Sequence, residues 1–190
     1  MAQKPVHILF LSAANSARSL IAETLLRDFG GGRVRAFSAG TQPDGQMLPM
    51  VEQLLQTKGY DTAGLFSKTH KLFMEDGAPD IDLVISMSAP DENELVLGPL
   101  GALRVHWQMP GINALKTSSD QKNFIKTIYK QLEDSICQVL QPSWDGLSVR
   151  DVQCLFERVG PVTKNSNKPY NEIFPAPYFG DFTGTELALA

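Results

Sequence analysis

The residues best suited to chemistry lie at positions 12–19, where the sequence reads SAANSARS. An apolar run over 6–11 precedes this segment, and a pattern typical of a helix follows it. A loop that joins a strand to a helix presents backbone N–H groups to a ligand, and the helix dipole also favours an anion there. Arg18 adds a planar guanidinium that can bind two oxygens of one oxyanion. We therefore predict an oxyanion-binding loop, with an ordinary strand-to-helix turn as the alternative.

Small side chains dominate this loop and let its backbone wrap closely around a ligand. Asn15 tolerates the left-handed backbone conformation that such a loop needs. The predicted oxyanion-binding residues are Ser12, Ala13, Ala14, Asn15, Ser16, Ala17, Arg18 and Ser19.

Strand and helix patterns alternate around the loop. Apolar runs predict strands over 7–11, 33–37, 81–87 and 103–106. Apolar residues at helical spacing predict helices over 18–28, 49–58, 118–140 and 147–159, with a short helix over 67–73 and a turn at 38–41. This order indicates a doubly wound α/β fold with a mostly parallel sheet.

The pattern weakens after residue 142. We expect residues 1–142 to form the main domain and residues 143–190 to form a C-terminal helix and an extended arm. The arm, 162–190, is rich in Pro, Asn and Gly, and it would pack on its own core or on a partner, a second copy of the chain included.

Composition narrows the class of protein. The chain has 190 residues, 43% hydrophobic content and a net charge of −4, as expected for a globular protein without a nucleic-acid surface. No apolar run is long enough to span a membrane or to form a signal-peptide core, so we expect a cytoplasmic protein. Cys137 and Cys154 are interpreted as buried structural thiols, and the three histidines show no metal-ligand spacing. No cofactor or metal is expected.

The loop also carries a resemblance. SAANSARS resembles the C-x5-R-S loop of the low-molecular-weight protein tyrosine phosphatases and, more closely, that of the thiol-dependent arsenate reductases. The similarity continues in AFSAGTQPDG (36–45), GLFSKTHKLF (64–73), DLVISMS (82–88) and VHW (105–107). It implies the phosphatase-I fold, a four-stranded parallel sheet flanked by helices. It also implies that Ser38 supports the loop by bonding Asn15 and Ser19, although a simple turn or capping role is the alternative.

The chain departs from the family pattern at three catalytic positions. Ser12 stands where the resemblance implies a nucleophilic cysteine, with Arg18 as its oxyanion-binding partner. Ser88, or alternatively Ser86, stands at the resolving-cysteine position of the arsenate reductases. Gly111 or a neighbour replaces the general-acid aspartate, and PAPYFGD (175–181) offers only Ala176 at a second possible position.

A serine hydroxyl needs an adjacent general base to act as a nucleophile. His7 is expected at the far end of the first strand, whereas His70 or His106 could approach the loop in space. Whether the protein is an enzyme therefore stays open at this point.

Three hypotheses follow from these observations. The first is a protein that binds phosphate, arsenate, sulfate or a phosphorylated protein with little or no catalysis. The second is an active phosphatase or arsenate reductase, either with Ser12 replacing a native cysteine or with Ser12 as a weak nucleophile. The third is a non-catalytic interaction protein that acts through its C-terminal arm.

Overall fold

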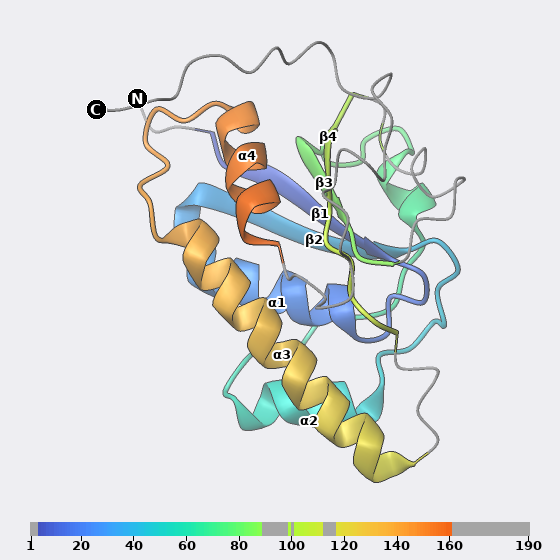
Figure 1. Cartoon of the computed structure of the whole chain (residues 1–190). Coiled ribbons are helices and arrows are strands. Elements are labelled where there is room, and N and C mark those ends of the chain that lie inside the picture. The colour runs from blue at the N-terminus through green and yellow to red at the C-terminus, as the bar shows by residue number, and fades with distance from the viewer. Residues whose placement is uncertain (1–3, 89–98, 100, 112–116, 161–190) are drawn as a thin grey trace.

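Four parallel strands form the centre of the molecule (Figure 1). The structure is a computed structural model that describes residues 4–88, 99, 101–111 and 117–160. The strands run in the order β2-β1-β3-β4. Their bounds are Val6–Ser12 for β1, Val34–Gly40 for β2, Leu83–Ser86 for β3 and Leu103–His106 for β4.

Helices connect and cover these strands. They are α1 (Arg18–Gly30), α2 (Pro49–Thr57), α3 (Ser118–Leu140) and α4 (Val149–Val159), with short 3-10 turns η1 (Gly31–Arg33) and η2 (His70–Phe73). Local sequence explains several helix starts. Pro49 occupies the first turn of α2, and the Ser148 and Asp151 side chains form a reciprocal capping box at α4. No described helix is long and apolar enough to cross a membrane.

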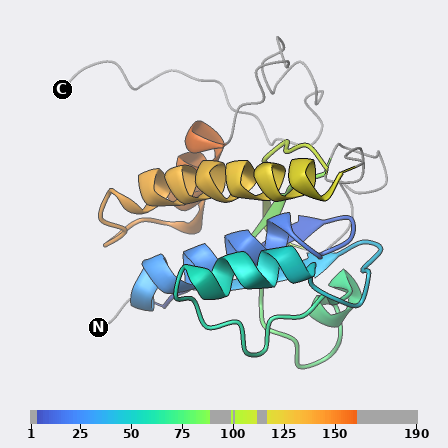
Figure 2. The same cartoon turned by 90° about the horizontal axis from the view of Figure 1, so that it is seen from below.

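The two faces of the sheet are covered differently. Ile8, Phe10 and Ile85 point to one face, where they join the large core built by the helices. Figure 2 shows α3 running alongside α1 in this layer. Alternate strand residues, Leu9 and Leu11 among them, pack in a smaller cluster on the opposite face. This alternation follows from the twofold side-chain period of a strand.

The predicted fold class is confirmed, because the sheet is four-stranded, parallel and flanked by helices. The turn predicted at 38–41 is wrong, since Ser38 and Gly40 belong to β2. Pairing with β1 through the Ser12–Gly40 register extends β2 past the apolar run that the sequence shows.

The interpretation of the two cysteines as buried is also wrong. Cys137 on α3 is exposed and Cys154 on α4 is half-buried. The core face of α3 is taken by Ile136 and Val139, which leaves the side chain at 137 on the outer face.

Helix α4 is attached to the sheet through aromatic packing. Phe156 and Trp107 are fully buried, their ring centroids lie 5.4 Å apart in a stacked arrangement, and the Trp107 indole N–H donates to the Phe156 carbonyl at 2.9 Å. Val152 and Phe156 belong to the same core as the strands. The division of the chain at residue 142 stays a prediction, although α4 itself shares the core of the preceding residues.

Replacing Phe156 by Ala is expected to lower the free energy of unfolding by about 3–5 kcal/mol, because a large stacked ring is lost from a closed core. Denaturant unfolding followed by circular dichroism measures the change. Met74→Ala is the control, since Met74 is 56% exposed and its truncation should have little effect. Equal destabilisation by the two substitutions would contradict the role assigned to α4.

Candidate functional site

The loop of residues 12–19 runs from the end of β1 into the first turn of α1, at the carboxyl edge of the sheet. From β1 the chain crosses to β2 on one side, whereas β3 lies on the other side of β1. A ligand in an open α/β sheet binds at such a reversal, beyond the carboxyl ends of the strands. The fold therefore brings the loop together with the residues that follow β3 and β4.

A second loop, over 41–48, fixes the direction in which the peptide groups of the first loop point. Four backbone carbonyls of the first loop face the second and accept hydrogen bonds from it. These bonds run from the amides of Thr41, Gln42, Asp44 and Leu48 to the carbonyls of Ser12, Ala13, Ala14 and Ser16, at 2.9–3.0 Å.

The amide hydrogens of these peptide units face away from the second loop, because C=O and N–H point in opposite directions in a trans peptide. Within the described part of the chain, the amides of Ala14 and Ala17 donate to no protein acceptor. Helix α1 also begins without a side-chain cap at Ala17. Amides without a protein acceptor at an uncapped helix start are groups that can bind an anion.

Asn15 holds the loop in this shape. Its φ of 47° lies in the left-handed region, and its side chain is fully buried. The side-chain amide donates to the hydroxyls of Ser19 and Ser38 at 2.9 Å each, and its oxygen accepts from the Lys68 backbone N–H at 2.8 Å. Ser38 and Ser19 are therefore linked through Asn15 rather than to each other.

Ser12 lies at the end of β1 with its hydroxyl inside this network. Its Oγ lies 2.7 Å from Ser19 Oγ, and it accepts from the Asn15 backbone N–H at 3.2 Å. Ser12 is buried, with 3% of its surface exposed. Its partners are thus a hydroxyl and an amide, neither of which can remove a proton as a general base.

The histidines lie elsewhere. His7 Nδ1 bonds the carbonyl of Asp80 near the start of β1. His70 Nδ1 bonds the Gly40 carbonyl at 3.1 Å, and His106 Nδ1 bonds Ser86 Oγ at 2.8 Å. Burial lowers the pKa of His106. None of the three contacts the Ser12 hydroxyl.

Arg18 connects the loop to the ends of β3 and β4. One guanidinium nitrogen donates to the carbonyls of Met87 and Met109, at 2.8 and 2.7 Å. The other lies 3.5 Å from Ser88 Oγ, which also accepts from the Ala13 amide at 2.9 Å. Ser88, at the predicted resolving-cysteine position, therefore lies directly against the loop.

Sequence reasoning missed a buried ion pair beneath the loop. Glu23 of α1 accepts from Ser38 Oγ at 2.5 Å, and its carboxylate lies 3.5 Å from Lys68 Nζ. Both charged side chains are about nine-tenths buried, at 10% and 11% exposure. The sequence contained a signal for this pair. Glu23 lies three residues after Leu20, so a charged residue stands on the apolar face of helix α1, where it needs a partner.

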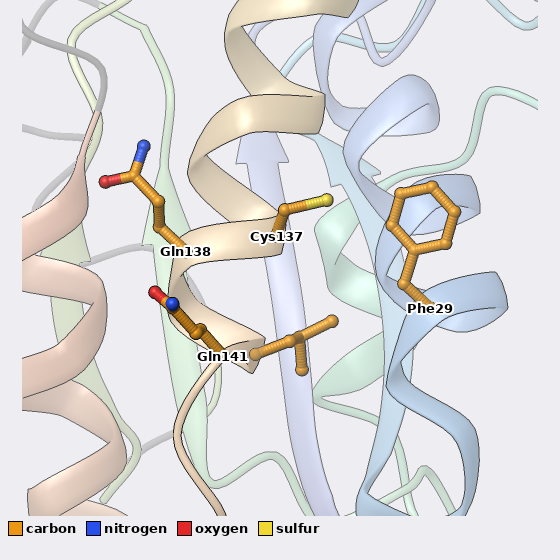
Figure 3. A pocket seen from close by; sticks show the side chains of 5 residues that line it. Phe29, Cys137, Gln138 and Gln141 are labelled. Carbon is orange, nitrogen blue, oxygen red and sulfur yellow. The ribbon is translucent and has the colours of Figure 1, made fainter.

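The remaining predicted positions contribute less. Gly111 ends a described segment and is exposed, whereas 112–116 and 175–181, with Ala176, lie outside the described residues. The described chain contains no group of three or more His, Cys, Asp or Glu that could hold a metal ion. Cys137 and Phe29 border a shallow hollow between α3 and α1 (Figure 3), at the opposite end of α1 from the loop.

These features agree with a comparison against protein families. A model described as low molecular weight phosphotyrosine protein phosphatase matches residues 7–105, slightly more than half of the 190 residues. The chain belongs to this family. The match includes the loop, Ser38 and Ser88. No curated protein sequence matches the chain significantly.

Solved structures of several relatives share the fold. Escherichia coli K30 tyrosine phosphatase Wzb, in complex with sulphate, is 16% identical, with a TM-score of 0.57 over 71% of this chain and 96% of that protein. An arsenate reductase in the phosphate binding state is 22% identical, with a TM-score of 0.53 over 72% of this chain and 97% of that one.

A thioredoxin-dependent arsenate reductase from Corynebacterium glutamicum is 25% identical, with a TM-score of 0.49, and 72% of this chain is covered. The matched region spans 64% of that enzyme, which is less than two thirds of its length.

The close approach of β2 to the loop yields a prediction at Gly40. A Cβ at this position would lie 2.7 Å from the Ala13 carbonyl oxygen and 3.1 Å from Asn15 Cβ, so the loop would have to move. We expect Gly40→Ala to cost about 1–3 kcal/mol of unfolding free energy. Gly111→Ala is the matched control, since a Cβ there meets no atom within 4 Å. Thermal unfolding compares the two variants, and an unchanged Gly40→Ala protein would contradict the tight packing.

Proposed function

We propose that this protein binds a tetrahedral oxyanion in the loop of residues 12–19 and has little or no catalytic activity. The ligand is phosphate, arsenate or sulfate, free or as a phosphorylated side chain. One observation carries the proposal. The amides of the loop point away from the segment 41–48, Arg18 is fixed beside the loop, and the Ser12 hydroxyl has no general base among its partners. We also propose the cytoplasm as its location.

The geometry supports binding in three ways. The carbonyls of the loop are directed outward and bonded to 41–48, so its amides face the other way. The N-terminus of α1 adds a positive dipole end. Arg18 is anchored by two carbonyls beside the loop, which fixes a permanent positive charge there. The relatives described with sulphate and with phosphate support the same class of ligand.

The chemistry of Ser12 supports the absence of turnover. A thiol can be ionised by a helix N-terminus and a guanidinium, but a hydroxyl is far more basic and needs a general base. Ser12 Oγ contacts only Ser19 and Asn15 among the described residues. Serines also occupy 86 and 88, where the arsenate reductases would carry a resolving cysteine.

Titration of the folded protein with sulfate and phosphate, followed by calorimetry, tests binding. We expect Arg18→Ala to weaken affinity by about tenfold or more, because charge-assisted hydrogen bonds contribute about 1.5–3 kcal/mol each. Arg35→Ala is the matched control, since Arg35 is exposed on β2 and lies away from the loop.

Circular dichroism first establishes that both arginine variants are folded. Failure of the wild-type protein to bind any of the oxyanions would refute the proposal. Equal affinity in the Arg18 and Arg35 variants would show that binding occurs at another site.

An active phosphatase or arsenate reductase is the second candidate function, favoured by the intact loop. In this case Ser12 either replaces a native cysteine or acts as a weak nucleophile. Turnover of an aryl phosphate by the wild-type protein, abolished in Ser12→Ala, would support it. An interaction role of the arm 162–190 and a homodimer stay predictions, because the arm lies outside the described residues.

Ser12→Cys is expected to introduce slow hydrolysis of p-nitrophenyl phosphate. The loop and helix dipole favour a thiolate, whereas loss of a general acid typically lowers the rate by about 10²–10⁴-fold. Rates are compared with those of an active family phosphatase assayed in parallel. Full activity of the single variant would show that a general acid is present after all.

A further inference from the structure

Two serine hydroxyls border the proposed oxyanion site, and their hydrogen-bond partners determine whether each can accept or donate. Ser12 Oγ and Ser88 Oγ both contact backbone amides of the loop, those of Asn15 and Ala13. A hydroxyl has one proton to donate and two lone pairs to accept with. The direction of each bond can therefore be assigned from the groups at the far end of the network.

Glu23 forms a buried ion pair with Lys68, so its carboxylate accepts hydrogen bonds and donates none. Ser38 Oγ must donate to it, at 2.5 Å. The Lys68 backbone N–H can only donate, so the oxygen of the Asn15 amide faces it and the amide nitrogen faces the two serines. Both amide protons of Asn15 are then used, one on Ser38 and one on Ser19.

Ser19 is the next member of the chain. It is fully buried and accepts from Asn15, and its only other hydrogen-bond partner in the described structure is Ser12 Oγ at 2.7 Å. The Ser19 proton therefore goes to Ser12. Ser12 Oγ now accepts from both Ser19 and the Asn15 amide, which uses both of its lone pairs. The hydroxyl of Ser12 is left with a proton and no free acceptor capacity.

Ser88 reaches the same state by a different route. Its Oγ accepts from the Ala13 amide at 2.9 Å and lies 3.5 Å from a guanidinium nitrogen of Arg18. Both neighbours can only donate, so the lone pairs of Ser88 face donors. Its own proton is directed elsewhere, and no acceptor for it lies among the described residues.

We propose that Ser12 and Ser88 donate their protons to the bound oxyanion, so that the site presents donors only and selects tetrahedral dianions whose bound oxygens carry no proton. This inference rests on the proposed function and names the class of ligand. Sulfate meets this requirement in any orientation, because none of its oxygens carries a proton. A phosphomonoester dianion satisfies it with its three terminal oxygens, and its ester oxygen faces out of the site.

Protonation determines how well inorganic phosphate fits. Hydrogen phosphate turns its single O–H out of the site and presents three unprotonated oxygens, as a phosphomonoester dianion does. Dihydrogen phosphate has two protons and meets a donor with one of them, which leaves a buried polar group unsatisfied. This mismatch typically weakens binding by about tenfold.

The test measures dissociation constants for sulfate, inorganic phosphate and phenyl phosphate by calorimetry, on either side of the second ionisation of phosphate. We expect the affinity for sulfate to be independent of pH. Inorganic phosphate and phenyl phosphate should each bind roughly tenfold more weakly below their second ionisation than above it. An affinity for the two phosphates that does not change with pH would overturn the inference, whereas binding of none of the three ligands would overturn the proposed function instead.

Variants identify the groups responsible. Ser12→Ala and Ser88→Ala each remove one donor and should reduce the preference for sulfate over dihydrogen phosphate, measured below the second ionisation of phosphate. Ser88→Asp replaces a donor by an acceptor and should invert this preference. Ser67→Ala is the matched control, because Ser67 Oγ bonds the outward carbonyl of Ala14 and should leave the preference unchanged. An unchanged preference in the three variants at 12 and 88 would also overturn the inference.

Discussion

The site depends on one buried side-chain amide, that of Asn15. Its left-handed backbone turns the loop, and its three side-chain hydrogen bonds join β2, α1 and the segment at Lys68. Because every polar atom of this buried amide has a partner, the loop keeps one shape before any ligand arrives. A preorganised receptor of this kind loses little conformational entropy on binding. The same network sets the direction in which the Ser12 hydroxyl can donate.

A buried charge supports that amide. Glu23 and Lys68 are almost fully removed from water, and an ion pair in such a position gains little net stability, because desolvation offsets much of the attraction. The role of the ion pair here is to orient the Ser38 hydroxyl. The carboxylate accepts a hydrogen bond from the Ser38 hydroxyl, so Ser38 Oγ accepts from the Asn15 amide. Without an acceptor at position 23, the Ser38 hydroxyl would no longer be required to donate there, and the directions of the other hydrogen bonds would not be determined.

The sequence was informative where the determinants are local. Neighbouring residue types and spacing predict the first strand over 7–11, which the structure extends to Val6–Ser12. They also predict the small side chains of the loop and the left-handed Asn15. Contacts between distant residues could not be found in this way. The bond from Ala13 to Ser88 and the ion pair at Lys68 depend on strand order and on the path of the chain after β2. Ser38 was misplaced for the same reason, since its strand continues only through pairing with β1.

The stacking of Trp107 on Phe156 has a consequence for the order of folding during synthesis. Trp107 lies two residues before Met109, whose carbonyl holds Arg18, and α4 packs against the indole. The loop at residues 12–19 leaves the ribosome early, yet the wall that positions its arginine is completed only by the last described helix. Because α4 shares the core of the sheet, a nascent chain would acquire a competent anion site only after the residues of α4 have been synthesised.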